Sequence, residues 1–118
     1  MAREQEHRLC PKVESAFELL GKRWSGLIIH VLMDGAKRFK EISAIIPGMS
    51  DRMLAERFKE LEAAGIVERR VYPETPVRIE YSLTEKGRAL EPVIREMEKW
   101  ANEWVVPDHS IAEKTVSR

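Results

Sequence analysis

Residues 50–84 read SDRMLAERFKELEAAGIVERRVYPETPVRIEYSLT, and the hydrophobic pattern of this stretch changes its period halfway along. In the first half, Leu54, Phe58 and Leu61 recur at i, i+4 and i+7, which places them on one face of a helix. Ser50 can cap the start of that helix, because its hydroxyl can accept a hydrogen bond from an N–H group of the first turn. We therefore expect an amphipathic helix that begins just after Ser50.

The pattern after this helix has a period of two. Gly65 suits the left-handed conformation that often ends a helix. Residues 67–72 and 77–83 then alternate between two side-chain faces, which predicts two strands. Pro73 and Pro76 lie between them and favour a loop over a central strand. A helix that leads into a two-stranded hairpin with a charged tip predicts a winged helix.

Three further helices are expected upstream. Pro11 is favoured at a first helical position, so Cys10 should be the N-cap of a helix that ends at Gly21. Apolar residues then predict helices over residues 24–33 and 37–46, and a proline–glycine break follows the second of these. The short helix, the tight break and the longer helix after Ser50 together predict a helix-turn-helix. The expected fold class is α+β, mainly α: a winged helix-turn-helix.

A last long helix is expected over residues 84–105, because apolar residues recur there at helical spacing. Pro92 removes one backbone hydrogen bond and should kink this helix near its first two turns. An apolar stripe of this length on a small domain invites aggregation unless something covers it. We expect the tryptophans to pack, with Trp100 and Trp104 at a subunit interface; an aromatic ligand box is the alternative. The candidate interface residues are Phe17, Val93, Met97, Trp100 and Trp104.

The chain of 118 residues is 43% hydrophobic and 34% charged, which is typical of one soluble globular domain. We expect a flexible arm over residues 1–9, the domain over 10–106 and a polar tail over 107–118. No apolar run approaches the roughly 18 residues of a membrane helix, and no signal peptide is recognisable, so a cytoplasmic location is expected. The single cysteine excludes a disulfide within the chain.

The net charge is zero, with 20 Lys and Arg against 20 Asp and Glu. This balance gives no support to nucleic-acid binding by itself, since such domains are often basic. The distribution is more informative, because cations gather before and within the central helix while glutamates mark the last helix. A neutral total can therefore conceal a basic face.

The polar face of the central helix is a candidate for reading DNA. Arg52, Glu56 and Lys59 lie opposite the apolar stripe, and a helix of this kind fits the major groove. Arg52 can chelate guanine, Glu56 can accept from a cytosine amino group, and Ser50 can bind a base or a phosphate. The alternative is the solvated polar face that any amphipathic helix has.

Basic residues also cluster at the expected start of the third helix: Lys37, Arg38 and Lys40. They are unfavourable for the helix dipole there, so phosphate contact is a natural role, with a solvated cluster as the alternative. Arg78, beside the hairpin tip, can reach a minor groove or a phosphate, or instead pair with Glu68 or Glu80. The candidate DNA contacts are Lys37, Arg38, Lys40, Ser50, Arg52, Glu56, Arg57, Lys59 and Arg78.

Several motifs together resemble the HxlR-type winged-helix transcriptional regulators. They are Cys10-Pro11, LLGKRW at 19–24, RFKEI at 38–42, RFKELE at 57–62 and YSLTEKG at 81–87. The resemblance covers roughly residues 10–104 and implies a dimeric bacterial repressor whose terminal helices form the dimer. It is greatest to members that sense electrophiles and oxidants through an N-terminal cysteine. One departure is that this chain has no cysteine near its C-terminus, where such relatives can carry partner thiols.

Cys10 is the candidate redox sensor. A thiol at a helix N-cap faces unpaired N–H groups and the positive end of the dipole, which favour the thiolate. Arg8 and Lys12 add positive charge nearby. The alternative is a small buried hydrophobe, since free cysteines are commonly buried. The family resemblance favours the sensor, with oxidants or electrophiles such as diamide and quinones as reactants.

The leading hypothesis is thus a dimeric, sequence-specific DNA-binding repressor that recognises a palindromic operator and is switched through Cys10. The alternatives are a repressor that responds to a small ligand in the dimer cavity, and a winged helix used as a protein-interaction module. No nucleotide loop, catalytic triad or metal-ligand spacing occurs, so we expect neither an enzyme nor a cofactor. His30, within an apolar helix, is expected to be a hydrogen-bonded core histidine.

Overall fold

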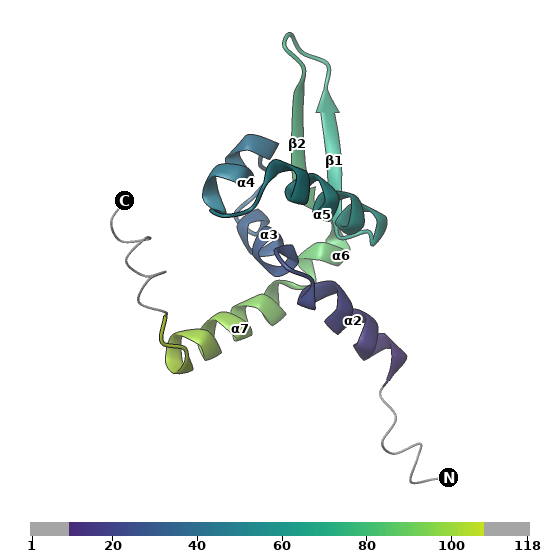
Figure 1. Cartoon of the computed structure of the whole chain (residues 1–118). Coiled ribbons are helices and arrows are strands. Elements are labelled where there is room, and N and C mark those ends of the chain that lie inside the picture. The colour runs from purple at the N-terminus through teal and green to yellow at the C-terminus, as the bar shows by residue number, and fades with distance from the viewer. Residues whose placement is uncertain (1–9, 108–118) are drawn as a thin grey trace.

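The computed structural model describes residues 10–107. Its elements, in chain order, are α2 (Pro11–Gly21), α3 (Ser25–Leu32), α4 (Phe39–Ile45), α5 (Asp51–Ala63), β1 (Val67–Tyr72), β2 (Arg78–Leu83), α6 (Glu85–Arg88) and α7 (Glu91–Trp104). The β1–β2 hairpin projects from one side of the body formed by α3, α4 and α5, and α2 and α7 diverge on the other side (Figure 1). The winged helix-turn-helix is confirmed; the predicted arm at 1–9 and tail residues 108–118 lie outside the described residues.

The wing is an antiparallel pair in which Val67 faces Leu83 at the base and Tyr72 faces Arg78 near the tip. A further backbone bridge joins it to the helix-turn-helix. The Lys37 N–H donates to the Tyr81 carbonyl at 2.9 Å, and the Tyr81 N–H donates to the Lys37 carbonyl at 2.8 Å. The segment just before α4 is therefore fixed to β2.

The core lies where α3, α4 and α5 meet the base of the wing. The apolar stripe predicted for the central helix is confirmed, because Leu54, Phe58 and Leu61 are at most 2% exposed. Burying each such side chain contributes about 1.5–3 kcal/mol. The Phe58 and Tyr81 rings stack with centroids 3.9 Å apart, which joins α5 to β2. From α7 only Ile94 is buried, and α2 buries no residue fully.

The single long helix expected over residues 84–105 was wrong, because the chain forms α6 and α7 instead. Thr84 caps α6, and its Oγ accepts a hydrogen bond from the Gly87 N–H at 3.1 Å. A new helix then begins at Glu91. Pro92 lies in the first turn of α7, where backbone N–H groups have no hydrogen-bond partner within the helix. A proline there removes no helical hydrogen bond, so Pro92 starts a helix and does not kink one.

Two other helices begin later than expected, each for a local reason. Trp24 has a φ of 80° in the left-handed region, so α3 begins at Ser25. Lys37 is held by its bridge to β2, so α4 begins after Arg38. His30 is not the core histidine expected, because its side chain is 43% exposed and its Nε2 lies 2.8 Å from a carboxylate oxygen of Glu98 on α7. Within residues 10–107, no helix has both the length and the apolar character to cross a membrane.

Candidate nucleic-acid interface and thiol site

The outer face of α5 carries Arg52, Glu56 and Lys59, and Ser50 precedes the helix. Ser50 caps the helix by accepting a hydrogen bond from the Met53 N–H at 3.1 Å. The Arg52 side chain is 90% exposed, and its Nε lies 3.6 Å from a carboxylate oxygen of Glu56. Lys59 is exposed on the same face. Because exposed pairs of this kind contribute about 0–1 kcal/mol, Arg52 and Glu56 can separate to meet base edges.

The basic cluster before α4 is positioned by the wing more than by the helix. The Lys37 backbone pairs with Tyr81, and Arg38 is the N-cap of α4. The Glu41 carboxylate accepts a hydrogen bond from the Arg38 N–H at 2.7 Å and places negative charge in the first turn. Only Lys40 lies within α4, so the conflict with the helix dipole is smaller than expected. The side chains of Arg38 and Lys40 are exposed.

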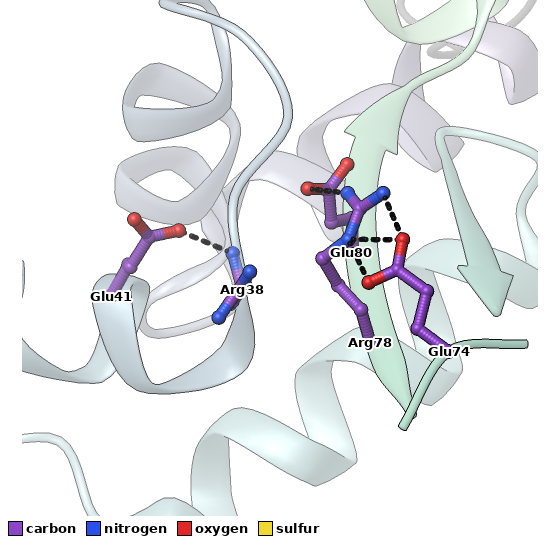
Figure 2. A network of polar contacts seen from close by, with 5 residues as sticks. All are labelled: Arg38, Glu41, Glu74, Arg78 and Glu80. Atoms are coloured by element: carbon purple, nitrogen blue, oxygen red, sulfur yellow. Dashed lines mark hydrogen bonds and ion pairs between the residues drawn. The ribbon is translucent and has the colours of Figure 1, made fainter. Parts of the chain in front are cut away.

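Arg78 is held by two carboxylates on the wing. Its Nη2 lies 2.9 Å from Glu74 and its Nη1 lies 2.6 Å from Glu80, as Figure 2 shows. Its guanidinium also covers the Tyr72 ring at 3.8 Å. Hydrogen bonds from Arg78 lower the pKa of Glu74, and the charge of Arg38 adds to this effect. The pairing alternative for Arg78 is therefore observed with Glu80, which is on the same strand, and with Glu74 in place of Glu68.

Arg57 does not lie on the outer face of α5. The whole residue is only 9% exposed, so Arg57 belongs to the interior. Its Nε donates to the Arg23 carbonyl at 2.8 Å, and its Nη1 lies 3.0 Å from Glu60. A buried guanidinium that is paired in this way is not available to a phosphate or a base. We therefore remove Arg57 from the candidate DNA contacts.

Cys10 is the N-cap of α2, as the sequence predicts, and its thiol is exposed. Exposure excludes the buried-hydrophobe alternative within this subunit. Lys12 is nearby in the first turn, but so is Glu14, whose negative charge the sequence argument overlooked. Arg8 lies outside the described residues. The expected preference for the thiolate stays a prediction.

The predicted interface residues are all exposed apolar side chains on the two helices that leave the body. Trp100 and Trp104 are 60% and 66% exposed, and Phe17 on α2 is 73% exposed. Val13 on α2 and Leu27 on α3 are also exposed. Val13 belongs to the same helical stripe as Phe17, so its spacing was the signal that points to it.

Residues 19–109 match the HxlR-like helix-turn-helix family. The chain belongs to that family. It is 62% identical over 106 residues to the HTH-type transcriptional regulator YodB of Bacillus subtilis, covering 90% of this chain and 95% of that one. The fold and the relatives make this HxlR-type protein a transcriptional regulator, and not an enzyme.

Solved structures extend the likeness. The reduced form of B. subtilis YodB matches with a TM-score of 0.75 and 64% identity, covering 86% of this chain and 99% of that one. Diamide-treated and quinone-bound YodB each match with a TM-score of 0.71, at 65% and 61% identity; they cover 86% and 81% of this chain and 100% of theirs. The helix-turn-helix of this HxlR-type regulator implies DNA binding.

Proposed function

We propose that this regulator is a homodimeric repressor that binds a palindromic operator in the cytoplasm and releases it when an oxidant or electrophile modifies Cys10. One observation carries the proposal: the only cysteine of the chain is exposed at the start of α2. Its relative YodB is described in reduced, diamide-treated and quinone-bound forms, which supports a thiol that reacts with both kinds of reagent.

The chemistry at Cys10 takes one of two routes. A quinone adds directly: the thiolate sulfur bonds to a ring carbon, and the ring gains a proton and becomes a hydroquinone. Diamide instead oxidises two thiols to a disulfide, and its N=N bond takes up the two electrons and two protons. Because each chain has one cysteine, that disulfide joins either two subunits or Cys10 and a small thiol. The intersubunit bond requires Cα atoms within about 7 Å, and so two α2 helices that begin at the two-fold axis.

Operator binding before and after treatment tests this function directly. The reduced protein is expected to bind a palindrome as a dimer, with its α5 helices about 34–36 Å apart. Treatment with diamide or a quinone should release the DNA, and mass spectrometry should locate the added mass on Cys10. Unchanged affinity with Cys10 fully modified would exclude the switch.

A ligand-responsive repressor is the second candidate, and one cavity favours it. It has a volume of about 340 Å³ between α3 and α7 and is lined mainly by apolar side chains, Trp24, Leu27 and Met97 among them. Cavities of this size suit small ligands. Release of DNA on treatment of a protein that lacks Cys10 would favour this candidate.

Arg52→Ala is expected to relax the base preference of the protein. If Arg52 chelates a base, its loss costs about 1–3 kcal/mol of binding free energy and affects chiefly one operator position. Arg38→Ala should instead weaken binding to all sequences alike and flatten the slope of log K against log salt by about 0.9. Binding to a panel of single-base operator variants at several salt concentrations separates the two. Unchanged base preferences in Arg52→Ala would exclude it as a reader.

Trp104→Ala is expected to shift the dimer toward monomer. Removal of a Trp that is buried between subunits costs about 3–5 kcal/mol. Because Trp104 is 66% exposed within one subunit, the monomer fold should not change. Sedimentation velocity gives the dimer constant, and Val77→Ala, which removes an exposed apolar side chain next to the wing tip, is the control. An unchanged dimer would place Trp104 outside the interface.

A further inference from the structure

The interior of the described chain holds one charged side chain, Arg57. A buried charge is costly unless it is paired and hydrogen-bonded. Arg57 meets this condition through a carbonyl that lies 34 positions earlier, because its Nε donates to Arg23 at 2.8 Å. The same guanidinium donates to Glu60 at 3.0 Å. The inner face of α5 is thereby tied to the segment that follows α2.

A second contact joins α5 to the segment that follows α2. Lys22 Nζ donates to Glu60 at 2.9 Å, on the carboxylate oxygen that Arg57 does not use. The hydrogen bond from Lys22 is the largest influence on Glu60 and lowers the pKa of that carboxyl, so Glu60 is ionised at neutral pH. Residues 57 and 60 are one turn apart on α5, and residues 22 and 23 are adjacent. Both contacts therefore join one turn of α5 to the same pair of neighbouring residues.

Residues 22–24, which connect α2 to α3 and are called the joint below, are conformationally constrained. Trp24 has a φ of 80°, a conformation that is unfavourable for a bulky residue and persists only where the surroundings impose it. The Arg23 guanidinium lies 4.5 Å from the centroid of the Trp24 ring. Trp24 also lies beside Gly48, in the turn that leads into α5: a Cβ added there would be 3.7 Å from the Trp24 ring. The joint thus contacts both the start and the inner face of the recognition helix.

The helix that carries Cys10 is attached to the core near its C-terminal end, where the partly buried Leu19 and Leu20 pack against it. No residue of α2 is fully buried, and within residues 10–107 no side chain of α2 itself hydrogen-bonds to another element. Its 11 residues span about 16 Å at about 1.5 Å each, and this length separates Cys10 from the end of α2 where these contacts lie. A modification at Cys10 can therefore displace α2 as a rigid body about its C-terminal end, which is held by the packing of Leu19 and Leu20 and by the contacts of Lys22 and Arg23.

We propose, building on the thiol switch above, that Arg57 with Glu60 and Lys22 is a positioning group that fixes the recognition helix to the end of α2. Without contacting DNA, it sets the orientation in which α5 meets the groove, and it transmits a displacement of α2 to α5. Loosening it should weaken operator binding by the reduced protein and also reduce the response to Cys10 modification.

Two substitutions of opposite charge test the positioning role. Lys22→Gln removes a cation and Glu60→Gln removes an anion, so a simple electrostatic effect on DNA would change the operator Kd in opposite directions. Loss of position should raise Kd in both, roughly threefold or more, since residues that couple sites act in the range of about 2- to 30-fold. The slope of log K against log salt should stay unchanged, because no phosphate contact is lost.

Arg57→Lys gives a third measurement, because an ammonium keeps the charge but lacks the fork that serves both the Arg23 carbonyl and Glu60. The matched control is Lys99→Gln, which breaks an exposed lysine–glutamate pair of 3.1 Å within α7. For each protein the operator Kd is measured before and after quinone treatment, and thermal unfolding confirms the fold. The Kd after treatment divided by the Kd before treatment should be smaller in the three test variants than in the wild type. In Lys99→Gln this ratio should equal the wild-type value.

The outcomes separate this inference from the proposed function. If the wild-type protein does not release DNA on treatment, the thiol switch fails and the transmission role fails with it, while the reduced-state affinities still decide the positioning role. If the wild type releases DNA and the test variants behave like Lys99→Gln, the inference is wrong. Kd changes of opposite sign in Lys22→Gln and Glu60→Gln would also overturn it.

Discussion

A Cys10→Ser protein is expected to keep its operator after treatment with diamide or a quinone, so that the response of the wild type is lost entirely. Cys10 is the only cysteine of the chain, and a serine hydroxyl forms neither a disulfide nor a quinone adduct at neutral pH. The fold should be unaffected, because the thiol is exposed and serine is among the favoured N-cap residues. Reduced wild type and Cys10→Ser should therefore bind with equal affinity.

Fluorescence anisotropy with labelled operator measures this, with and without the reagent. Cys10→Ala is the matched control, because it lacks the hydroxyl that can cap α2. If both variants resist the reagent, the loss of the thiol is responsible, and not a change in capping. A Cys10→Ser protein that still releases DNA on treatment would remove Cys10 from the mechanism.

Gly87→Ala is expected to lower the free energy of unfolding by about 3 kcal/mol, the upper end of what an overpacked core usually costs. Gly87 is buried in α6, and a Cβ there would overlap the Ile66 carbonyl oxygen and lie 3.2 Å from the Leu83 side chain. That carbonyl also accepts the Thr84 N–H at 3.0 Å, so it is not free to move away. The backbone between α5 and β1 must shift to accommodate the methyl group.

Urea unfolding followed by circular dichroism measures this loss. Gly21→Ala is the control, since the space around its Cβ position is empty to 4 Å. In α2, alanine should be neutral or stabilise the protein by about 0.4–1 kcal/mol, mainly by restricting the unfolded chain. Equal midpoints for Gly87→Ala and the wild type would mean that the Ile66 backbone moves at little cost.

The parts of the fold that sequence predicted well are those with local causes. The stripe of Leu54, Phe58 and Leu61 and the left-handed Gly65, with a φ of 77°, required only helical spacing and steric rules. The final helix was wrong because spacing continues through the break at 89–90. The break lies just before Pro92, whose ring and missing N–H favour the first turn of a new helix over the interior of a continuous one, and periodicity does not detect this.

The site was harder to predict, because its charges are defined by tertiary partners. Arg57 was assigned to DNA on its charge, although its position three residues after Leu54 and four before Leu61 places it beside the apolar stripe. Its spacing was therefore a usable signal. Arg78 was recognised as a possible partner of Glu80, but the contact with Glu74 depends on the fold of the wing tip. The exposed face of Arg52, Glu56 and Lys59 followed from periodicity alone.

The bridge between Lys37 and Tyr81 has a consequence for the thermodynamics of operator binding. Because the two residues exchange both backbone hydrogen bonds, the base of the wing is already ordered against the helix-turn-helix in the free protein. DNA binding then requires little loss of conformational entropy at this point. The heat-capacity change of binding should accordingly reflect the surface that is buried, without the larger contribution that accompanies coupled folding.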